Sequence, residues 1–540
     1  MANLIEIRGL RVEATTDAGR RIEIIRGVDL DVAPGEIVAL IGESGSGKTT
    51  IAQSLMGHTR PGCRISGGAV RVNGTDMVAL GERARADIRG RDIAYIPQSA
   101  AAAFNPAHRI IEQVIEVTRI HRTMPPEAAR TRALELFRAL SLPEPETIGN
   151  RYPHQVSGGQ LQRLAAAMAL IGGPKLVIFD EPTTALDVTT QIEVLRAFKS
   201  VMRAGGVGGV YVSHDLAVVA QIADRIVVLK GGEVQESGTT DAILHRPAHP
   251  YTRALLAAFE PKAHAPAAPP GGAPALFAAE GLVAGYGPIR ADGRPLVCAV
   301  KGVSLRLAAG RNLGIVGESG CGKSTLARAI AGIVPPVAGS IRFDGQPLAA
   351  DGRKRSRAHL RDIQIVFQHA DTALNPTRTI EEILGRPLTF YHGLKGAARI
   401  ARIEELLEMV QLPKALRHRH AGELSGGQKQ RVNLARALAA EPKLIICDEI
   451  TSALDTVVGA AIIELLKDLQ ARLGLSYIFI SHDLSVVQAI CDDIAVMYRG
   501  EKIEELTQSP GGIAPQQPYS RLLFASVPRL DPGWLDSLPA

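Results

Sequence analysis

Four short motifs occur in the first half of the chain and recur in the same order in the second half. The pairs are the glycine-rich loops 42–49 and 317–324, the Ser-Gly-Gly-Gln segments 157–160 and 425–428, the Asp-Glu pairs 180–181 and 448–449, and the Ser-His-Asp triplets 213–215 and 481–483. The last three pairs share one offset of 268 residues (425 − 157, 448 − 180 and 481 − 213). Self-similarity at a fixed spacing predicts two homologous lobes in one polypeptide.

The segment between the two motif sets indicates where one lobe ends and the next begins. Residues 261–275 are rich in proline and alanine and lack apolar periodicity, which is typical of a semi-rigid linker. We therefore expect one lobe over 1–260 and another over 276–540. A chain of 540 residues is too long for one hydrophobic core, and its 46% apolar content lets each lobe bury its own.

Composition also limits the cellular setting that we expect. No uncharged apolar run approaches the ~18 residues of a membrane span, and the first residues lack the pattern of a secretory signal. We expect a cytoplasmic protein that reaches a membrane only through partners. The five scattered cysteines lack metal-ligand spacing and predict reduced thiols. The basic run 353–357 lacks interleaved aromatic residues, so we expect a solvated loop rather than a nucleic-acid surface.

Each lobe alternates apolar runs of strand length with helical segments. The runs 175–179 and 443–447 are continuously apolar, as expected for central strands that are covered on both faces. The stretches 107–170 and 378–440 contain periodic Leu, Ile and Ala residues and few strand formers. The pattern predicts an α/β fold in which each lobe has a mainly parallel sheet and a helical subdomain inserted before the Ser-Gly-Gly-Gln segment.

Both glycine loops follow a strand and precede a helix, which predicts phosphate binding. Closely spaced glycines let backbone N–H groups surround phosphate, and the helix N-terminus adds the positive end of its dipole. Lys48 and Lys323 would reach the β- and γ-phosphates, while the hydroxyls of Thr49 and Ser324 would bind Mg²⁺. The predicted ATP-binding residues of the loops are Gly42, Ser44, Gly45, Ser46, Gly47, Lys48, Thr49, Thr50, Gly317, Ser319, Gly320, Cys321, Gly322, Lys323, Ser324 and Thr325.

The Asp-Glu pairs stand at the ends of the apolar runs. Asp180 and Asp448 are placed to hold Mg²⁺, whereas Glu181 and Glu449 point elsewhere because successive strand side chains alternate. We expect each glutamate to orient and polarise the water that attacks the γ-phosphate. Ordinary solvation explains one isolated acidic pair, but it is disfavoured for two pairs in register with the glycine loops.

The complete pattern resembles the ATP-binding-cassette superfamily over nearly the whole chain. The Ser-Gly-Gly-Gln segments are similar to the signature motif of that family. The resemblance implies two P-loop NTPase lobes, each with an additional antiparallel β part, and two composite sites. In each site, the signature of one lobe clamps the γ-phosphate of ATP that the opposite lobe holds. The signature residues are Ser157, Gly158, Gly159, Gln160, Ser425, Gly426, Gly427 and Gln428.

Two glutamines and two histidines also match positions of this family. The resemblance implies that the glutamines sense the metal and the attacking water, and that the histidines donate to the γ-phosphate. The implied catalytic residues are Glu181, Glu449, His214, His482, Gln98 and Gln368. The implied metal ligands are Thr49, Gln98, Asp180, Ser324, Gln368 and Asp448. Asp187 and Asp455 match the loop through which the two lobes communicate.

The sequence departs from the family pattern at three positions, the first of which is Val156, where the family usually has leucine beside the signature. Tyr286 matches the aromatic residue on which the family stacks adenine, with simple packing as the alternative, whereas the matching residue of the first lobe is Ala14. Site one is therefore expected to hold adenine more weakly. Ile450 replaces the proline that is present as Pro182, but this change removes no ligand. Because both glutamates are present, we expect two hydrolytic sites.

Local segments indicate a branch of the superfamily. The segments 103–106 and 373–376, and the Pro-Tyr tails 249–256 and 517–523, resemble the oligopeptide, dipeptide and nickel importer ATPases, including fused glutathione-type members. The resemblance implies a bacterial importer subunit at the cytoplasmic face of the inner membrane that uses ATP and Mg²⁺. Its implied partners are two transmembrane permeases and an extracytoplasmic solute-binding protein. The tail regions lack cysteine, so no iron–sulfur cluster is expected.

A soluble twin-cassette ATPase that acts on ribosomes or DNA is the alternative from another class. Ribosome-associated members join their lobes with a long charged helix, and DNA-repair members have zinc-binding cysteine clusters; this sequence has neither. An exporter ATPase is a third alternative, which the Pro-Tyr tails disfavour. We expect no nucleic-acid partner. The transported solute does not follow from the sequence, because permeases and binding proteins select it.

Cys321 lies within the second glycine loop, directly before Gly322 and Lys323. The following helix N-terminus and the lysine both favour a thiolate. We therefore expect a thiol that reacts rapidly with maleimides and that bound ATP shields, unless the loop buries it.

Overall fold

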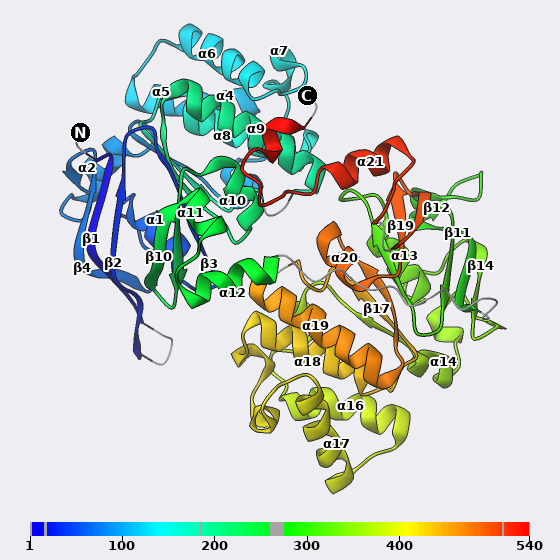
Figure 1. Ribbon diagram of the computed structural model, residues 1–540. Helices are drawn as coiled ribbons and strands as arrows, with labels where there is room; N and C mark the ends of the chain where they lie inside the picture. The colour runs from blue at the N-terminus through cyan, green and yellow to red at the C-terminus, as the bar shows by residue number, and fades with distance from the viewer. Residues whose placement is uncertain are drawn as a thin grey trace. The chain divides into compact units, whose positions relative to one another are not determined.

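The computed structural model describes residues 3–15, 19–183, 186–259, 275–452, 454–509 and 512–538. Contacts divide the chain into two compact units: unit 1 comprises Met1–Phe259 and Pro528–Ala540, and unit 2 comprises Glu260–Val527. Of the expected linker, 261–274 lies outside the described residues. Each unit carries one motif set on two sheets and a group of helices (Figure 1).

The central sheet of unit 1 has its strands in the order β10-β9-β3-β8-β7-β6. In this order they span Glu233–Thr239, Arg225–Lys230, Ile37–Gly42, Gly208–Val212, Leu176–Asp180 and Ile93–Ile96. Neighbouring strands are parallel except for β9 and β10. Every residue of β3, β7 and β8 is buried, as the continuous apolar runs predict for a sheet with helices on both faces.

A second, antiparallel sheet of unit 1 has the order β2-β1-β4-β5. These strands span Arg21–Val32, Ile5–Thr15, Cys63–Val72 and Thr75–Asp76. Ile5, Ile7, Leu10 and Val12 of β1 are fully buried and join the core cluster that also contains residues of β3. Helices α1 (Lys48–Ser54), α2 (Glu82–Ile88), α9 (Val188–Gly205) and α10 (Leu216–Ile222) lie between strands, and α11 (Thr240–His245) and α12 (Pro250–Phe259) follow β10.

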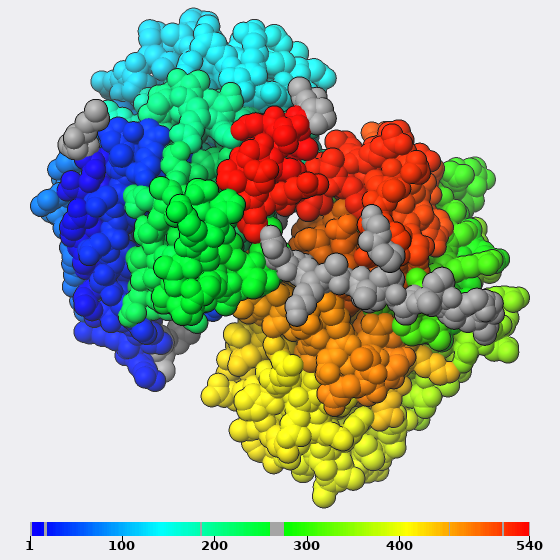
Figure 2. Space-filling model, in the orientation of Figure 1, coloured from blue at the N-terminus to red at the C-terminus, as the bar shows by residue number. Residues whose placement is uncertain are grey.

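A helical insertion separates β6 from β7 in unit 1. It consists of α3 (Ala100–Ala103), α4 (Ile110–Val114), α5 (Glu116–His121), α6 (Pro126–Ala139), α7 (Pro145–Ile148), η1 (Pro153–Gln155) and α8 (Gly158–Leu170). The helical subdomain that the sequence predicts over 107–170 is thus confirmed. In the space-filling view, the cyan atoms of this insertion and the blue atoms of the antiparallel sheet form separate regions of the unit's surface (Figure 2).

Unit 2 repeats this architecture with the same strand orders. Its central sheet has the order β16-β17-β18-β13-β19-β20, with strands at Ile363–Val366, Leu444–Asp448, Ser476–Ile480, Asn312–Val316, Asp493–Tyr498 and Glu501–Thr507. Its antiparallel sheet has the order β12-β11-β14-β15, with strands at Pro295–Ala308, Ala275–Ile289, Ala338–Phe343 and Gln346–Pro347.

The helices of unit 2 also follow the arrangement in unit 1. Two short helices, η2 (Gly352–Lys354) and α14 (Arg357–Asp362), precede β16. The insertion between β16 and β17 consists of α15 (Ala370–Ala373), α16 (Ile380–His392), α17 (Gly396–Met409), η3 (Lys414–His418), η4 (Ala421–Glu423) and α18 (Gly426–Leu438). The others are α13 (Lys323–Ile330), α19 (Thr456–Leu473), α20 (Leu484–Ile490) and α21 (Pro518–Ala525). The structure thereby confirms the duplicated α/β fold.

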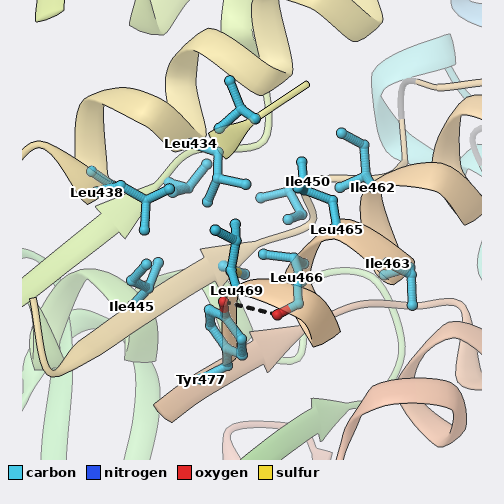
Figure 3. Packing of buried hydrophobic residues seen from close by; sticks show 14 of the residues in the cluster. Leu434, Leu438, Ile445, Ile450, Ile462, Ile463, Leu465, Leu466, Leu469 and Tyr477 are labelled. Atoms are coloured by element: carbon cyan, nitrogen blue, oxygen red, sulfur yellow. Dashed lines mark hydrogen bonds between the residues drawn. The ribbon is translucent and has the colours of Figure 1, made fainter. Parts of the chain in front are cut away.

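The main core of unit 2 forms where α18 and α19 pack on the sheet (Figure 3). Leu434 and Leu438 of α18 meet Ile445 of β17, and α19 adds several further aliphatic side chains. Tyr477 is buried in this cluster, and its hydroxyl donates to the Leu466 carbonyl oxygen at 3.2 Å. The hydrogen bond offsets the desolvation of the phenol.

The basic run 353–357 is only partly solvated. Arg355 is buried, and its Nε donates to the Ala349 carbonyl oxygen at 2.8 Å. Burial lowers the pKa of its guanidinium to about 10. The expectation of a solvated loop is therefore wrong at Arg355, because this side chain holds the chain before α14.

The C-terminal segment packs on unit 1, although the sequence assigned it to the second lobe. Gln221 of α10 donates to the carbonyl oxygens of Arg529 and Asp531 at 2.8 Å and accepts from the Leu535 amide at 2.9 Å. Trp534 and Leu535, in the short helix α22 (Trp534–Ser537), are buried. These contacts explain why the chain from Pro528 onward groups with unit 1.

In the part of the chain that the structure describes, no helix combines the length and apolar character that crossing a membrane requires.

Candidate functional site

The glycine loops adopt conformations that only glycine permits. Gly47 has φ = 99° and Gly322 has φ = 105°, both in the left-handed region. A Cβ at Gly47 would lie 2.3 Å from Ile25 Cδ1, and one at Gly322 would lie 2.1 Å from the Ala299 carbonyl oxygen. The two glycines therefore let each loop turn tightly against the antiparallel sheet just before its helix begins.

Each loop lysine is folded back over its own loop. Lys48 Nζ donates to the carbonyl oxygens of Gly42 and Glu43 at 2.8 and 2.9 Å. In unit 2, Lys323 Nζ makes the same bonds to the residues at 317 and 318, at 2.7 and 2.8 Å. Both lysines are buried. A buried ammonium beside backbone N–H groups at a helix N-terminus suits an anionic ligand such as phosphate.

The residues predicted to bind Mg²⁺ lie next to one another in both units. Thr49 Oγ1 donates to Asp180 Oδ1 at 2.8 Å, and Ser324 Oγ donates to Asp448 Oδ1 at 2.9 Å. Burial raises the pKa of Asp448. Hydroxyl and carboxylate oxygens beside a phosphate loop fit Mg²⁺, which binds through oxygen ligands and usually shares them with phosphate.

The two glutamates after these aspartates adopt strained backbone conformations. Glu181 has φ = 48° and Glu449 has φ = 49°, in the left-handed region that disfavours residues with a Cβ. Their amides donate to the carbonyl oxygens of Val212 and Ile480, each at 3.0 Å. Strain of this kind concentrates at functional sites, where the surrounding structure fixes it. The carboxylates of both glutamates lie next to the predicted glutamine and histidine.

Those glutamines and histidines bind the glutamates directly. Gln98 Nε2 donates to Glu181 Oε2 at 3.1 Å, and Gln368 Nε2 donates to Glu449 Oε2 at 2.7 Å. The Nδ1 atom of the histidine lies 3.4 Å from a carboxylate oxygen of the glutamate in both units. Each unit therefore brings the loop, the Asp-Glu pair, the glutamine and the histidine to one edge of its central sheet.

The glutamate beside each histidine affects the pKa of that histidine. Burial alone would lower the pKa of His482, but the hydrogen bond to Glu449 and the charge of Glu449 together outweigh burial, so the pKa is raised. The same balance raises the pKa of His214 beside Glu181. Burial would raise the pKa of Glu449, yet its bond to His482 leaves that pKa lowered. An ionised glutamate and a histidine that readily protonates are the forms that hydrolysis of a phosphoanhydride requires.

The signature segments begin the last helix of each insertion. Ser157 caps α8 and Ser425 caps α18, and both form a reciprocal capping box with the glutamine three residues later. A Cβ at Gly159 would lie 2.0 Å from Thr190 Cγ2, so α8 can approach α9 only with glycine there. Gly158 faces open space. The signatures thus present the exposed N-terminus of a helix.

Asp187 and Asp455 cap the helices that follow the Asp-Glu pairs. Asp187 accepts from the Thr190 amide of α9, and Asp455 accepts from the Val458 amide of α19, both at 3.0 Å. In unit 1, Thr190 therefore contacts the signature helix as well as the cap of α9.

Tyr286 lies beside the second glycine loop. It is 41% exposed on β11, and its hydroxyl lies 3.4 Å from both Thr325 Oγ1 and Arg328 Nη1 of α13. Gly9 of β1 and Gly281 of β11 both have a left-handed backbone, with φ of 56° and 57°. Ala14 and Tyr286 each follow this glycine by five residues (14 − 9 and 286 − 281), so they occupy equivalent positions in the two units. The exposed ring is available for stacking, and Ala14 supplies none in unit 1.

Cys321 does not have the reactive character expected from its position. The thiol is buried at 5% exposure, and this burial raises its pKa despite the nearby charge of Lys323. Desolvation of a thiolate outweighs the lysine because the side chain points into the core beneath the loop. The exception stated for the rapidly reacting thiol therefore applies, because the loop buries Cys321.

Three tyrosine contacts were not foreseen from the sequence. Tyr95 Oη donates to Asp180 Oδ2 at 2.6 Å. Tyr251 of the first Pro-Tyr tail accepts a hydrogen bond from the Glu43 amide in the glycine loop at 3.3 Å, and Tyr519 accepts one from the Glu318 amide at 3.0 Å. The equal spacing of the two tails from their motif sets (519 − 251 = 268) was the available signal.

Comparison with known proteins agrees with this geometry. The ABC transporter family matches residues 25–184 and 300–452, and the C-terminal region of oligopeptide/dipeptide transporters matches residues 235–278. The chain belongs to the ABC transporter family. It is an ATPase whose two nucleotide-binding cassettes are fused in one polypeptide.

Relatives match it over almost their whole length. The chain is 38% identical to the peptidoglycan transport ATP-binding protein YejF of Agrobacterium fabrum, over 97% of this chain and 96% of that protein. It is also 38% identical to the glutathione import ATP-binding protein GsiA of Escherichia coli O157:H7, over 98% of this chain and 90% of that protein. A dimeric ATP-binding cassette in a post-hydrolysis state bound to ADP and phosphate matches 44% of this chain and 98% of its own, with 28% identity and a TM-score of 0.40.

Proposed function

We propose that the chain is the ATP-hydrolysing subunit of a bacterial importer for peptides or a related small solute. The observation that carries the proposal is the glutamine, glutamate and histidine group beside a glycine loop, which both units repeat. The match of residues 235–278 to oligopeptide/dipeptide transporters and the names of the relatives support the importing role.

Two composite ATP sites are part of this proposal. We assign to site one Lys48, Thr49, Gln98, Asp180, Glu181 and His214 with the signature residues Ser425, Gly426, Gly427 and Gln428. We assign to site two Lys323, Ser324, Gln368, Asp448, Glu449 and His482 with Ser157, Gly158, Gly159 and Gln160. The exposed, capped N-termini of α8 and α18 suit a phosphate of ATP that the other unit holds.

The side chains divide the chemistry in a way that their contacts support. In site two, Lys323 exchanges its loop carbonyls for phosphate oxygens of ATP, and Glu449 accepts a hydrogen bond from the attacking water. His482 turns from Glu449 to donate to the γ-phosphate. Ser324 and Asp448 would hold Mg²⁺, which when bound neutralises charge on the phosphates.

Transport requires partners that the chain does not contain. We infer two transmembrane permeases and an extracytoplasmic solute-binding protein, with the chain held peripherally at the cytoplasmic face of the inner membrane. Closure of the cassettes around ATP and their release after hydrolysis would drive alternating access in the permeases.

Reconstitution tests this function directly. The chain, the permeases encoded beside it and the binding protein would be placed in vesicles, and uptake of glutathione and short peptides would be followed with ATP on the cassette side. We expect uptake that stops in a Glu181→Gln/Glu449→Gln variant. ATPase activity that ribosomes or DNA stimulate, with no solute uptake, would instead support the soluble twin-cassette alternative.

A further inference from the structure

The Pro-Tyr tails contact the glycine loops in the same way in both units. The Gly42–Glu43 peptide accepts a hydrogen bond from Lys48 Nζ through its carbonyl oxygen at 2.8 Å. Its N–H donates to the Tyr251 hydroxyl at 3.3 Å. A single peptide unit at the start of the glycine loop is thus held on one side by the phosphate-binding lysine and on the other by the tail tyrosine.

Unit 2 repeats this arrangement with shorter distances. The Gly317–Glu318 peptide accepts from Lys323 Nζ at 2.7 Å and donates to the Tyr519 hydroxyl at 3.0 Å. A packing contact alone would require the tyrosine ring but not its hydroxyl. The recurrence of the hydroxyl contact in two units of diverged sequence indicates that the hydrogen bond itself has a role.

Each tyrosine is held in place by an acidic residue of the last strand. Glu236 of β10 accepts from the amides of Ala248 and His249 at 2.7 and 3.0 Å, just before α12. In unit 2, Glu504 of β20 accepts from the amides at 516 and 517, at 2.7 and 3.3 Å, just before α21. The carboxylate therefore fixes the first turn of the helix that carries the tyrosine.

The rings are supported at one equivalent position. Lys230 Nζ lies 4.5 Å from the centroid of the Tyr251 ring, and the Tyr498 ring lies 4.4 Å from that of Tyr519. Lys230 and Tyr498 are separated by the same 268 residues as the tyrosines that they contact (498 − 230). A lysine in unit 1 and a tyrosine in unit 2 thus pack on the tail tyrosine from equivalent positions, and in both units the tyrosine hydroxyl contacts its glycine loop.

We propose that Tyr251 and Tyr519 are positioning residues that fix the first peptide of each glycine loop for ATP binding. The proposal rests on the assignment of these loops to ATP. When the lysine moves to phosphate, the carbonyl oxygen of the peptide loses its partner, and the tyrosine becomes the group that keeps the peptide in place. The same bond would be made in the ATP complex and in the transition state, so its loss should lower nucleotide affinity and leave the chemical step unchanged.

Tyrosine-to-phenylalanine variants of the full chain isolate the hydroxyl from the ring. Tyr519→Phe should weaken binding of a non-hydrolysable ATP analogue about three- to tenfold at one of two sites, the range of one ordinary hydrogen bond. It should raise KM for ATP with little change in kcat, and speed hydrogen exchange of the Glu318 amide. Tyr251→Phe should act likewise on the first loop. Tyr498→Phe, which removes a hydroxyl from the neighbouring ring, is the matched control and should bind as wild type does.

Two further variants separate the possible results. Glu504→Ala should weaken binding only while Tyr519 is present, so the double variant should bind like Tyr519→Phe alone. Lys323→Met should weaken binding strongly, and unchanged binding would overturn both the ATP-site assignment and the positioning role. If Lys323→Met binds the ATP analogue weakly while the phenylalanine variants bind it as wild type does, the ATP-site assignment stands and only the positioning role is wrong. Equal losses in Tyr519→Phe and Tyr498→Phe would also overturn it.

Discussion

Tyr95 donates a 2.6 Å hydrogen bond to Asp180 Oδ2, while Thr49 donates to the other carboxylate oxygen at 2.8 Å. Ile365 stands at this position in unit 2, since both residues precede the site glutamine by three (98 − 95 and 368 − 365). The aspartates proposed to hold Mg²⁺ therefore differ in their surroundings. This asymmetry lies in the metal site, in addition to the difference between Ala14 and Tyr286.

Removal of the Tyr95 hydroxyl should weaken metal binding at site one. Tyr95→Phe leaves the ring in place but frees Asp180 to rotate away from Thr49, so the Mg²⁺ concentration for half-maximal ATP hydrolysis should rise about three- to tenfold. Titration of ATPase activity with Mg²⁺ measures this, with Ile365→Val in unit 2 as the control. A lower Mg²⁺ requirement would show that the tyrosine competes with the ion instead of orienting its ligand.

Loss of either glutamate should strongly slow hydrolysis at its own site. Glu181→Gln and Glu449→Gln each retain the shape of the side chain but cannot accept the proton of water, so turnover at that site should fall by about 10²–10⁴. Binding of ATP should persist. Phosphate release and nucleotide binding by the full chain measure the two effects, and a wild-type rate in either single variant would mean that its site is regulatory.

The histidine–glutamate pairs should make the stability of the nucleotide-free protein depend on pH. Histidine has an ordinary pKa of 6.5, and folding raises that of His214 and His482. Their stabilising contribution is therefore fully present below pH 6.5 and is lost as the pH rises through the raised, folded-state pKa. The lowered pKa of Glu449 acts at the opposite end, because its contribution is lost as the pH falls through that lowered value.

Thermal unfolding between pH 6 and pH 9 would measure the histidine effect. We expect the midpoint to fall with rising pH in the wild type and to fall less in a His214→Asn/His482→Asn variant. Parallel curves for the two proteins would show that these pairs are not coupled to folding in the way the geometry indicates.

Much of the fold and the site could be predicted because its determinants are local. Continuous apolar runs indicated β7 and β17, and the glycine spacing located the loops before α1 and α13. The Asp-Glu pairs followed from their position at the strand ends. A feature that depends only on the residues of a single strand, loop or helix can be predicted from the sequence.

The rest depended on contacts between distant segments. The burial of Cys321 comes from the core beneath the loop and not from its neighbours in sequence, so the local argument for a thiolate failed. Tyr519 lies 201 residues from the Glu318 amide that it binds. The contacts of Gln221 with the C-terminal segment span more than 300 residues. Periodicity and motif spacing contain no information on such pairings.

Adenine binding should depend on Tyr286 in site two. Tyr286→Ala removes an exposed ring next to α13 and should weaken ATP binding there by about 1–3 kcal/mol if the ring stacks on the base. Ala14→Tyr is the reciprocal variant and should strengthen site one. Site-resolved binding of a fluorescent ATP analogue measures both, and unchanged affinity at site two would show that Tyr286 only packs.

The C-terminal segment should leave unit 1 when Gln221 is replaced. Trp534 is the single tryptophan of the chain and is 4% exposed, so its fluorescence reports the packing of this segment. Gln221→Ala removes two hydrogen bonds that the side chain donates and one that it accepts, all with backbone groups of the C-terminal segment. This loss should weaken the packing of the segment by about 2 kcal/mol and shift the emission to longer wavelength. Asp536→Asn breaks only the surface ion pair with Lys199 and should leave the spectrum unchanged, because exposed pairs contribute little. An unshifted spectrum in Gln221→Ala would mean that the apolar contacts of Trp534 and Leu535 are sufficient to hold the segment on unit 1.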